Sequence, residues 1–364
     1  LYVFTKPQME EEYSEEKPAE TDSMLYTRDW KEAKAALEAG RRVVYSPWLS
    51  DLNYECPQLS GGSVGWNGQM GPTWCRTMGV VIDEKHPIFK YFPTGRAGGW
   101  QWEDILKNSR GFHMEGLEQV KSIVQPIDDW NRNLLQGMMF EAEVLNGRLL
   151  FVSANLEGTF EKRPEAYCLK QAVLKYAGSE DFCASGAVPR VDIQKIEDKF
   201  FPTLRMSELT KEISYGSLGE DGKVKDGIAI VEADPGTSVR VMKDSFPVTI
   251  TITLQRAITV KGFLYVPEQR DREHEGFARE YRLEVRNGET GCWEKAAEGT
   301  FLNTCRSQRI LFEQEAVTEA IRLIVLSAYG CEDKYVWEEN RRGWEQKFKP
   351  KTAVVQIAGI HVIC

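Results

Sequence analysis

The amino-acid sequence predicts an α/β domain followed by an all-β domain, an antiparallel sandwich or barrel. With 364 residues, the chain is longer than one typical hydrophobic core, so two domains are expected. In the first half, helical periodicity alternates with short apolar strands, which is typical of an α/β layer. In the second half, short alternating strands follow one another with turn residues between them. The expected domains are residues 23–180 and 193–364.

The segments outside these two domains have the composition of linkers. Residues 1–22 begin with a strand candidate, Tyr2–Thr5, which we interpret as the end of a preceding domain, and continue as a Glu-rich run. A run this acidic and poor in apolar residues cannot bury a core, so it is expected to be a solvated linker. The start has neither an initiator Met nor a signal peptide, and the chain is expected to be part of a longer protein. Residues 181–192 are expected to join the two domains.

The first helix is the best marked element of the α/β domain. Apolar residues keep helical spacing over Trp30–Leu37, Thr27 or Asp29 can cap the start, and Gly40 can end it. The two-residue turn Asn146-Gly147 predicts a β-hairpin. The other expected elements are a helix at Glu165–Tyr176 and strands at Arg42–Ser46, Thr77–Ile82, Ser122–Asp128, Met138–Val144 and Arg148–Ala154.

Strand patterns dominate the second half of the chain. Turn signals such as Arg286-Asn287-Gly288 separate them, and helical periodicity is nearly absent, which favours the antiparallel sandwich or barrel. The expected strands are Val239–Val241, Val248–Leu254, Thr259–Tyr265, Tyr281–Arg286, Glu294–Glu298, Gln308–Glu313, Ala320–Leu326 and Thr352–Ile363.

Charge and hydropathy exclude several classes of protein. The formal net charge is −9, so the chain lacks the basic character with which proteins neutralise nucleic-acid phosphates. No apolar run approaches the roughly 20 residues that span a bilayer. The eight Cys are scattered without a Cys-x-x-Cys pair. We therefore expect no nucleic-acid partner, no membrane span and no metal site, and mostly free, buried thiols.

An ordered set of motifs in residues 78–156 carries a family resemblance. The motifs are His86-Pro87 with Phe92-Pro93-Thr94, Trp100-Gln101-Trp102, Ile123-Val124-Gln125-Pro126-Ile127-Asp128, and Phe140-Glu141-Ala142-Glu143-Val144 with Gly147-Arg148-Leu149-Leu150. This part resembles the C-terminal accessory region of bacterial family 2 glycoside hydrolases, the beta-galactosidase and beta-glucuronidase relatives. The resemblance implies a flavodoxin-like or glutamine-amidotransferase-like α/β layer domain that follows a catalytic barrel and is not itself the hydrolase.

The second half carries another resemblance, over about 130 residues. Its matching residues are Val260-Lys261-Gly262-Phe263-Leu264-Tyr265-Val266-Pro267, Tyr281-Arg282-Leu283-Glu284-Val285 with Trp293, Glu298-Gly299-Thr300-Phe301 and Ala320-Ile321-Arg322-Leu323. They resemble a discoidin domain, also called coagulation factor 5/8 type C, and the family 32 carbohydrate-binding modules, which implies a jelly-roll β-sandwich. The usual Asp-Gly…Thr-x-Trp segment is missing or degenerate near Asp234–Thr237, so a structural calcium is possible but not supported, and no other cofactor is implied.

The chain shows no complete catalytic set. Asp128 and Asp129 are adjacent at the end of a predicted strand, so their side chains point to opposite faces. Glycoside hydrolysis needs two carboxylates about 5–9.5 Å apart, and Glu103 or Asp104 would have to complete the pair. A strand-end Asp more often caps a turn. Ser153 follows a strand but lacks the glycine pattern of a nucleophile elbow. An independent glycoside hydrolase using Asp128 or Asp129 remains the alternative.

Two loops of the second half have side chains suited to sugars. The resemblance implies sugar sites on loops at one rim of the sandwich, where an aromatic platform combines with charged or amide groups. The loops Glu268–Phe277 and Tyr329–Lys349 fit that chemistry. Aromatic residues in a polar loop are either a glycan platform or, as the alternative, packed against the first domain. The candidate residues are Gln269, Arg270 and His274 in the first loop and Tyr329, Trp337 and Trp344 in the second.

These observations predict a non-catalytic, C-terminal part of a secreted bacterial glycoside hydrolase, extracellular or periplasmic. Its expected role is carbohydrate binding or architectural support of the parent enzyme. The expected partners are a glycan or polysaccharide and the catalytic barrel of the parent chain, with homo-oligomerisation possible. A purely structural or oligomerisation module is the second alternative.

Overall fold

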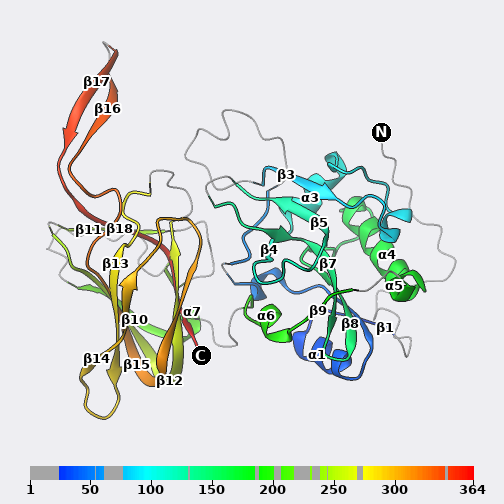
Figure 1. The fold of residues 1–364 in the computed structure, drawn as a ribbon, viewed down its shortest axis with the longest axis horizontal. Helices are drawn as coiled ribbons and strands as arrows, with labels where there is room; N and C mark the ends of the chain where they lie inside the picture. Colours follow the sequence, from blue (N-terminus) through cyan, green and yellow to red (C-terminus); the bar gives the residue numbers. More distant parts are fainter. Residues whose placement is uncertain are drawn as a thin grey trace. The chain divides into compact units, whose positions relative to one another are not determined.

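The computed structural model describes residues 24–53, 55–60, 77–129, 132–184, 188–200, 206–216, 230–231, 238–243, 245–268, 274–340 and 343–364. The chain forms two compact units, Leu1–Phe201 and Pro202–Cys364, which are called unit 1 and unit 2 below (Figure 1). The predicted linker 1–22 lies outside the described residues.

Unit 1 is built on a mixed sheet with the strand order β1-β2-β8-β7-β5-β3, and β9 also pairs with β7. The strands are β1 (Met24–Thr27), β2 (Arg42–Tyr45), β3 (Gly79–Ile82), β5 (Ser122–Ile127), β7 (Met139–Val144), β8 (Gly147–Val152) and β9 (Arg190–Val191). β1, β2 and β8 run parallel to one another, whereas β3, β5, β7 and β8 pair in antiparallel fashion. A small separate ladder joins β4 (Phe112–His113) to β6 (Gln136–Gly137).

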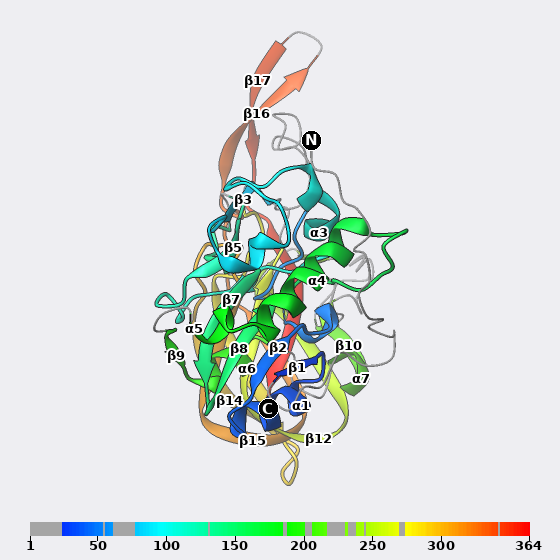
Figure 2. The same ribbon diagram turned by 90° about the vertical axis from the view of Figure 1, so that its right-hand side faces the viewer.

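The two longest helices of unit 1 pack against opposite faces of this sheet. α1 (Trp30–Glu38) packs with Val43 and Tyr45, whereas α4 (Pro164–Gly178) packs with Val44 of the same strand. Successive side chains of a strand point to opposite faces, so one short apolar strand contributes to both cores. Figure 2 shows α4 running across the strands. The shorter helices are η1 (Leu49–Asp51), η2 (Pro87–Lys90), η3 (Trp100–Trp102), α3 (Glu103–Lys107), α5 (Asp181–Ala184) and α6 (Ile193–Glu197).

The predicted hairpin exists, but its turn is shifted by one residue. Val144 pairs with Gly147, so the turn residues are Leu145 and Asn146, and Leu145 takes the positive φ of 54°. Gly147 is instead required by packing, because a Cβ there would lie 2.5 Å from the Arg41 carbonyl oxygen. Only glycine fits at this position, because the segment that follows α1 passes close to the start of β8.

The predicted linker 181–192 is wrong for its described residues, which belong to unit 1. Asp181–Ala184 form α5, and Val191 of β9 pairs in parallel with Val144 and is 3% exposed. α6 follows and buries Ile196 in the same core. The unit therefore ends near Phe201, later than the expected boundary at residue 180. Such short elements escape a composition argument because their packing partners lie far away in the sequence.

Unit 2 is an antiparallel β-sandwich with the strand order β11-β18-β12-β15-β13-β14, and β10 pairs with β12. The elements are α7 (Met206–Leu209), β10 (Thr210–Gly216), β11 (Val239–Lys243), β12 (Val248–Pro267), β13 (Glu280–Asn287), β14 (Trp293–Thr300), β15 (Gln308–Val325) and β18 (Ala353–Ile363). The antiparallel β architecture predicted for the second half is confirmed.

Two long strands join the layers of this sandwich. β12 pairs with β10 in its first half and with β18 in its second, and its register with β15 shifts between Thr253 and Ile258. Both halves contribute to one core, for example through Ile250 and Phe263. The sequence predicts two shorter strands in the place of β12 and two in the place of β15. The reason is that the alternation of apolar residues is interrupted where the register between β12 and β15 shifts. β10 was not predicted.

The stability of unit 2 is expected to depend on pH through the buried side chain of His361. It lies in β18 and is 4% exposed, and burial lowers its pKa from 6.5 to about 3. The unfolded chain therefore binds a proton more readily than the folded one, so stability should fall as the pH drops below 6.5 towards 3. We expect amide exchange of β18 peptides, corrected for intrinsic rates, to report larger opening at pH 5 than at pH 7. The variant His361→Leu should lose this dependence; an unchanged dependence would contradict the assignment.

Candidate functional site

The predicted loop Tyr329–Lys349 is largely a β-hairpin. β16 (Lys334–Asn340) and β17 (Gly343–Lys349) form a two-stranded sheet of their own. In Figure 1 this hairpin projects away from the other strands of unit 2. The loop prediction was wrong here because charged residues on alternate positions mask the strand pattern.

One face of the hairpin carries four exposed aromatic rings. The backbone pairs Tyr335–Phe348, Trp337–Gln346 and Glu339–Trp344 follow one another at intervals of two residues. The side chains of Tyr335, Trp337, Trp344 and Phe348 therefore leave the same face. We call Tyr335, Trp337, Trp344 and Phe348 the aromatic face. Their exposed fractions are 66%, 63%, 66% and 55%, and the rings of Tyr335 and Phe348 lie 5.4 Å apart.

The opposite face of the hairpin is charged. Lys334, Glu338, Lys347 and Lys349 alternate with the aromatic residues, and the Lys347 ammonium lies 2.8 Å from the Glu338 carboxylate. Water can solvate this side of the hairpin, whereas the aromatic side presents apolar surface to it. The hairpin is therefore amphipathic, and an exposed apolar face of this kind is typical of a binding surface.

Glu275 fastens the base of the hairpin to the rest of unit 2. Lys349 donates to both of its carboxylate oxygens at 2.8 Å, and Lys334 and Arg240 lie 3.7 and 3.9 Å away. Burial by itself would raise the pKa of Glu275, but these cations outweigh it and the pKa is lowered. Because Lys334 and Lys349 are the first and last residues of the hairpin, one carboxylate holds both strands.

We expect Glu275→Gln to loosen the hairpin without unfolding unit 2. Fluorescence anisotropy decay of the hairpin tryptophans, with the other tryptophans replaced, should show added motion in this variant at pH 7. Because the pKa of Glu275 is lowered from 4.5 in the folded chain, its ionised carboxylate stabilises the base of the hairpin fully above pH 4.5. This stabilisation is lost as the pH falls through the lowered pKa, so the wild type should loosen only below pH 4.5. Glu338→Gln, which removes a hairpin ion pair away from the base, is the matched control. Equal motion in the two variants would contradict the role of Glu275.

His274 and Tyr329 lie on loops that are bonded to each other. The Gly276 amide donates to the Tyr329 carbonyl oxygen at 2.8 Å. His274 adopts a positive φ of 56°, its Nδ1 lies 2.8 Å from Asn303 Oδ1, and its ring stacks on Phe277. The Tyr329 hydroxyl donates to the Phe301 carbonyl oxygen at 2.9 Å. Both side chains thus help to hold the loop conformation, and their role as sugar-binding groups stays a prediction.

The candidate residues are therefore divided between two places. His274 and Tyr329 order the loops beside Glu275, and Trp337 and Trp344 belong to the hairpin that Glu275 holds. Gln269 and Arg270 lie outside the described residues. Tyr335 was recognised from the sequence among the aromatic residues of the loop Tyr329–Lys349, whereas Phe348 was missed, although a period-2 count from Trp344 would have found it.

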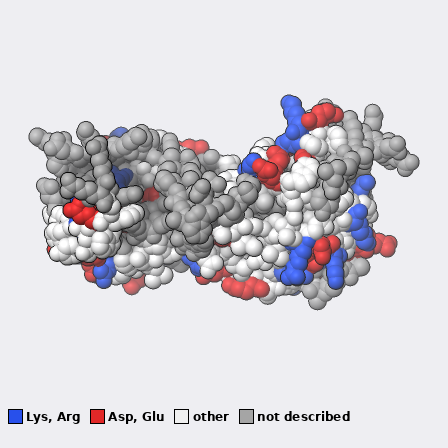
Figure 3. All heavy atoms as spheres, turned by 90° about the horizontal axis from the view of Figure 1, so that it is seen from above, with Lys and Arg blue, Asp and Glu red and all other residues white. Residues whose placement is uncertain are grey.

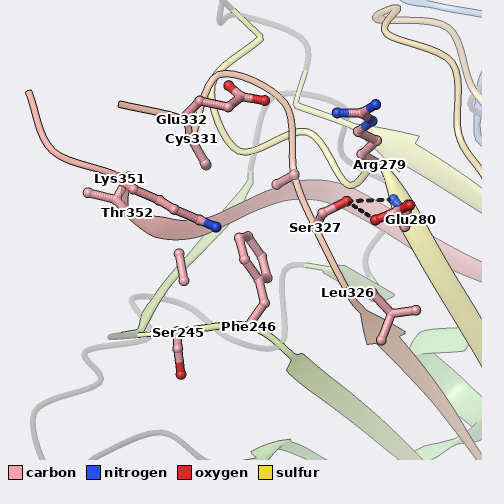
Figure 4. A pocket seen from close by; sticks show the side chains of 12 residues that line it. Ser245, Phe246, Arg279, Glu280, Leu326, Ser327, Cys331, Glu332, Lys351 and Thr352 are labelled. Atoms are coloured by element: carbon pink, nitrogen blue, oxygen red, sulfur yellow. Dashed lines mark hydrogen bonds between the residues drawn. The ribbon is translucent and has the colours of Figure 1, made fainter. Parts of the chain in front are cut away.

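A pocket of about 650 Å³ lies at the foot of the hairpin (Figure 4). The residues that matter chemically are Phe246, Arg279, Glu280, Ser327, Glu332 and Lys351. The Ser327 hydroxyl donates to the Glu280 carboxylate at 2.8 Å. Sequence reasoning missed this pocket because its walls come from four separate segments, none of which carries a motif.

Of the carboxylates considered for hydrolysis, Asp128, Glu103 and Asp104 form ion pairs within unit 1. Asp128 accepts from Arg132 at 2.5 and 2.9 Å and from the Leu134 amide at 2.8 Å, and it is 7% exposed. Glu103 pairs with Lys107 at 2.5 Å, and Asp104 pairs with Arg163 at 2.8 Å. These contacts stabilise a turn and a helix, which agrees with the structural interpretation of Asp128.

The Ser153 hydroxyl is buried and donates to the Arg110 carbonyl oxygen at 2.5 Å. Across the described ranges, no group of three or more His, Cys, Asp or Glu residues could hold a metal ion. No helix in the part of the chain that the structure describes is long and apolar enough to cross a membrane. On the face drawn in Figure 3, the basic and acidic side chains that can be seen lie close to one another.

Comparison with known protein families gives a match for one part of the chain. Residues 25–198 match the model of a family described as a domain of unknown function (DUF8487), and this range lies within unit 1. No curated protein matches the chain.

Solved structures that are similar to part of the chain include carbohydrate-binding modules. The family 32 module of NanJ from Clostridium perfringens, in complex with galactose, is 18% identical with a TM-score of 0.33, covering 43% of this chain and 95% of the module. A module of the same family from Clostridium perfringens, in complex with GalNAc-β-1,3-galactose, is 15% identical with a TM-score of 0.32, covering 42% and 94%. Chitosan-binding module 1 of a Paenibacillus chitosanase/glucanase is 15% identical with a TM-score of 0.30, covering 44% and 99%.

Proposed function

We propose that unit 2 is a carbohydrate-binding module and that the aromatic face of the β16–β17 hairpin is its glycan platform. The observation that carries this proposal is the exposure of four aromatic rings, 55–66% each, on a single face of one hairpin. An isolated two-stranded hairpin is marginally stable in water, and apolar surface of this kind usually marks a binding site.

The spacing of the rings suits the chain of a polysaccharide. Cross-strand pairs two residues apart are separated by about 7 Å, so the three successive pairs extend over about 14 Å. A sugar ring can place its C–H face on an aromatic ring while its hydroxyl groups bond polar neighbours. Gln346 lies opposite Trp337 and supplies amide donors and acceptors between the rings.

The wider proposal is that the chain is the non-catalytic C-terminal part of a secreted glycoside hydrolase. The ordered motifs of residues 78–156 support this parentage, and a flavodoxin-like or glutamine-amidotransferase-like assignment of unit 1 rests on the same motifs. The buried ion pair with Arg132 supports a structural, non-catalytic role for Asp128. On this proposal, unit 2 holds the parent enzyme near its polysaccharide substrate.

The alternative is an interaction module whose aromatic face binds protein, including a second copy of the chain. Exposed aromatic residues are compatible with that role as well. Affinity electrophoresis in gels containing soluble polysaccharides distinguishes the two proposals. Retardation by at least one polysaccharide is expected. Absence of retardation in every gel, together with self-association that depends on Trp337, would favour the interaction module.

A further inference from the structure

We infer that Asn287 is a site of spontaneous covalent modification, at which the turn between β13 and β14 converts the side-chain amide of Asn287 into a carboxylate. The reaction is a deamidation, and its only co-reactant is water. This inference goes beyond the proposed function, because it concerns a chemical change of the chain itself and does not depend on glycan binding.

The sequence contains three Asn-Gly pairs, at Asn67, Asn146 and Asn287. Asparagine followed by glycine is suited to deamidation, because glycine has no Cβ to keep its backbone nitrogen away from the preceding side chain. The pair at Asn67 lies outside the described residues. The sequence alone does not separate the other two pairs, whereas the structure does.

The reaction begins when the backbone nitrogen of Gly288 attacks the side-chain carbonyl carbon, Cγ, of Asn287. A new C–N bond forms within the chain, and the side-chain nitrogen of Asn287 leaves as ammonia with the proton that Gly288 loses. A five-membered imide ring remains. Water then adds to either carbonyl carbon of the imide and opens the ring, which yields aspartate or isoaspartate at position 287.

The attacking group, the Gly288 amide, is accessible and has room to move. Within the described part of the chain, this amide donates no hydrogen bond to another group. Gly288 is exposed, and a Cβ built on it would meet no atom within 4 Å. The nitrogen can therefore approach Cγ without first breaking a hydrogen bond or displacing a neighbour.

The side-chain carbonyl of Asn287 is oriented by the same turn. Its Oδ1 accepts hydrogen bonds from the amides of Glu289 and Thr290 at 2.9 and 3.1 Å. Attack on Cγ places negative charge on this oxygen, and backbone amides that already point at it stabilise that charge, as they do in an oxyanion hole. The turn therefore lowers the barrier of the first step.

The pair Asn146-Gly147 is held against the same reaction. The Asn146 amide donates to the Leu37 carbonyl oxygen at 3.2 Å, and its side-chain nitrogen donates to the Glu38 carbonyl oxygen at 2.9 Å. Gly147 is the first residue of β8, and a Cβ there would lie 2.5 Å from the Arg41 carbonyl oxygen. Imide formation would have to break these bonds and move a crowded backbone, so Asn146 is protected in the folded chain.

Deamidation of Asn287 places a negative charge beside an existing one. The side-chain nitrogen of Asn287 donates to Glu294 Oε1 at 2.8 Å. A carboxylate in its place cannot donate and repels Glu294, so the end of the sheet at this turn is destabilised. Asn287 is the last residue of β13, whereas Glu280, its first residue, accepts from Ser327 near the foot of the β16–β17 hairpin. The modified turn therefore lies at the opposite end of this strand from the hairpin.

The experiment follows deamidation of the full chain by peptide mass spectrometry, in mildly alkaline buffer made with oxygen-18 water and below the thermal transition. Asn287 should convert to aspartate and isoaspartate with uptake of the label. It should convert at least about tenfold faster than Asn146, a difference of about 1.4 kcal/mol in activation free energy. Gly288→Ala should slow conversion of Asn287 by about tenfold or more, because the added Cβ hinders the attacking nitrogen.

The chain unfolded in urea is the matched control, because it keeps both Asn-Gly pairs and removes both local structures. Asn146 and Asn287 should then convert at similar rates. Folding should slow Asn146 and leave Asn287 at least as fast as in the unfolded chain. Equal rates of the two residues in the folded chain, protection of Asn287 by folding, or unchanged conversion in Gly288→Ala would overturn the inference. Retardation by polysaccharide is measured independently, so the inference and the proposed function can fail separately.

Discussion

Replacement of both Trp337 and Trp344 by Ala is expected to weaken polysaccharide binding by about 100-fold or more. Covering one large aromatic side chain contributes about 1.5–3 kcal/mol, and each 1.4 kcal/mol is a factor of ten. The two tryptophans belong to successive cross-strand pairs and would contact the same glycan, so the double variant also measures the coupling between them. Each single variant should therefore lose about tenfold or more in affinity-gel retardation or titration calorimetry.

A matched control uses the other face of the same hairpin. The double variant Glu338→Ala/Lys347→Ala removes an ion pair with side chains that are half exposed, and it should bind polysaccharide as the wild type does. Both double variants keep the Tyr335–Phe348 ring contact, so a similar thermal transition is expected for both. Undiminished retardation of the tryptophan variant would reject the aromatic face as the platform.

Asp128→Asn is expected to destabilise unit 1 by about 3–5 kcal/mol. Asp128 and Arg132 are both almost buried, with side chains 2% and 8% exposed, and the carboxylate accepts two bonds from the guanidinium. An amide of the same size can no longer balance the guanidinium charge in a poorly solvated place. Urea unfolding followed through signals of unit 1 should show the loss. Glu103→Gln, which removes an exposed ion pair within α3, should change the stability little.

The same variant also tests the alternative of an independent glycoside hydrolase. If Asp128 were catalytic, Asp128→Asn would abolish turnover of aryl glycosides while the stability of unit 1 stayed within about 1 kcal/mol of the wild type. That combination would contradict the structural assignment. The geometry instead predicts a loss of stability and no turnover by the wild-type chain at high protein concentration.

Elements with a local signal could be predicted from the sequence. α1 starts where the Asp29 side chain accepts hydrogen bonds from the Lys31 and Glu32 amides. The helical spacing of its apolar residues predicted the element from the sequence. The antiparallel strands of unit 2 were predicted from their alternation, although the bends in β12 and β15 concealed that each is one strand. The hairpin turn was misplaced by one residue because Gly147 serves close packing and not the turn.

The candidate site could be predicted only in part. Trp337 and Trp344 stood out as aromatic residues in a polar segment, and both are exposed. Phe348, which lies on the same face, was missed because the segment was interpreted as a loop. His274 was predicted as a ligand-binding group; Asn303 and Phe277 contact its ring, and its role in binding stays a prediction.

By itself, the sequence determined the longer helices of unit 1, most strands of unit 2, the position of aromatic residues in a charged setting, and the two family resemblances that the chain carries. Those features depend on neighbours within a few residues, or on ordered motifs. Only the tertiary structure decided that four rings share one face, that Glu275 holds both strands of the hairpin, and that a pocket lies at its foot. The reason is physical: cross-strand register and ion pairs join residues far apart in the sequence, as Glu275 and Lys349 are, and no local pattern encodes such pairs.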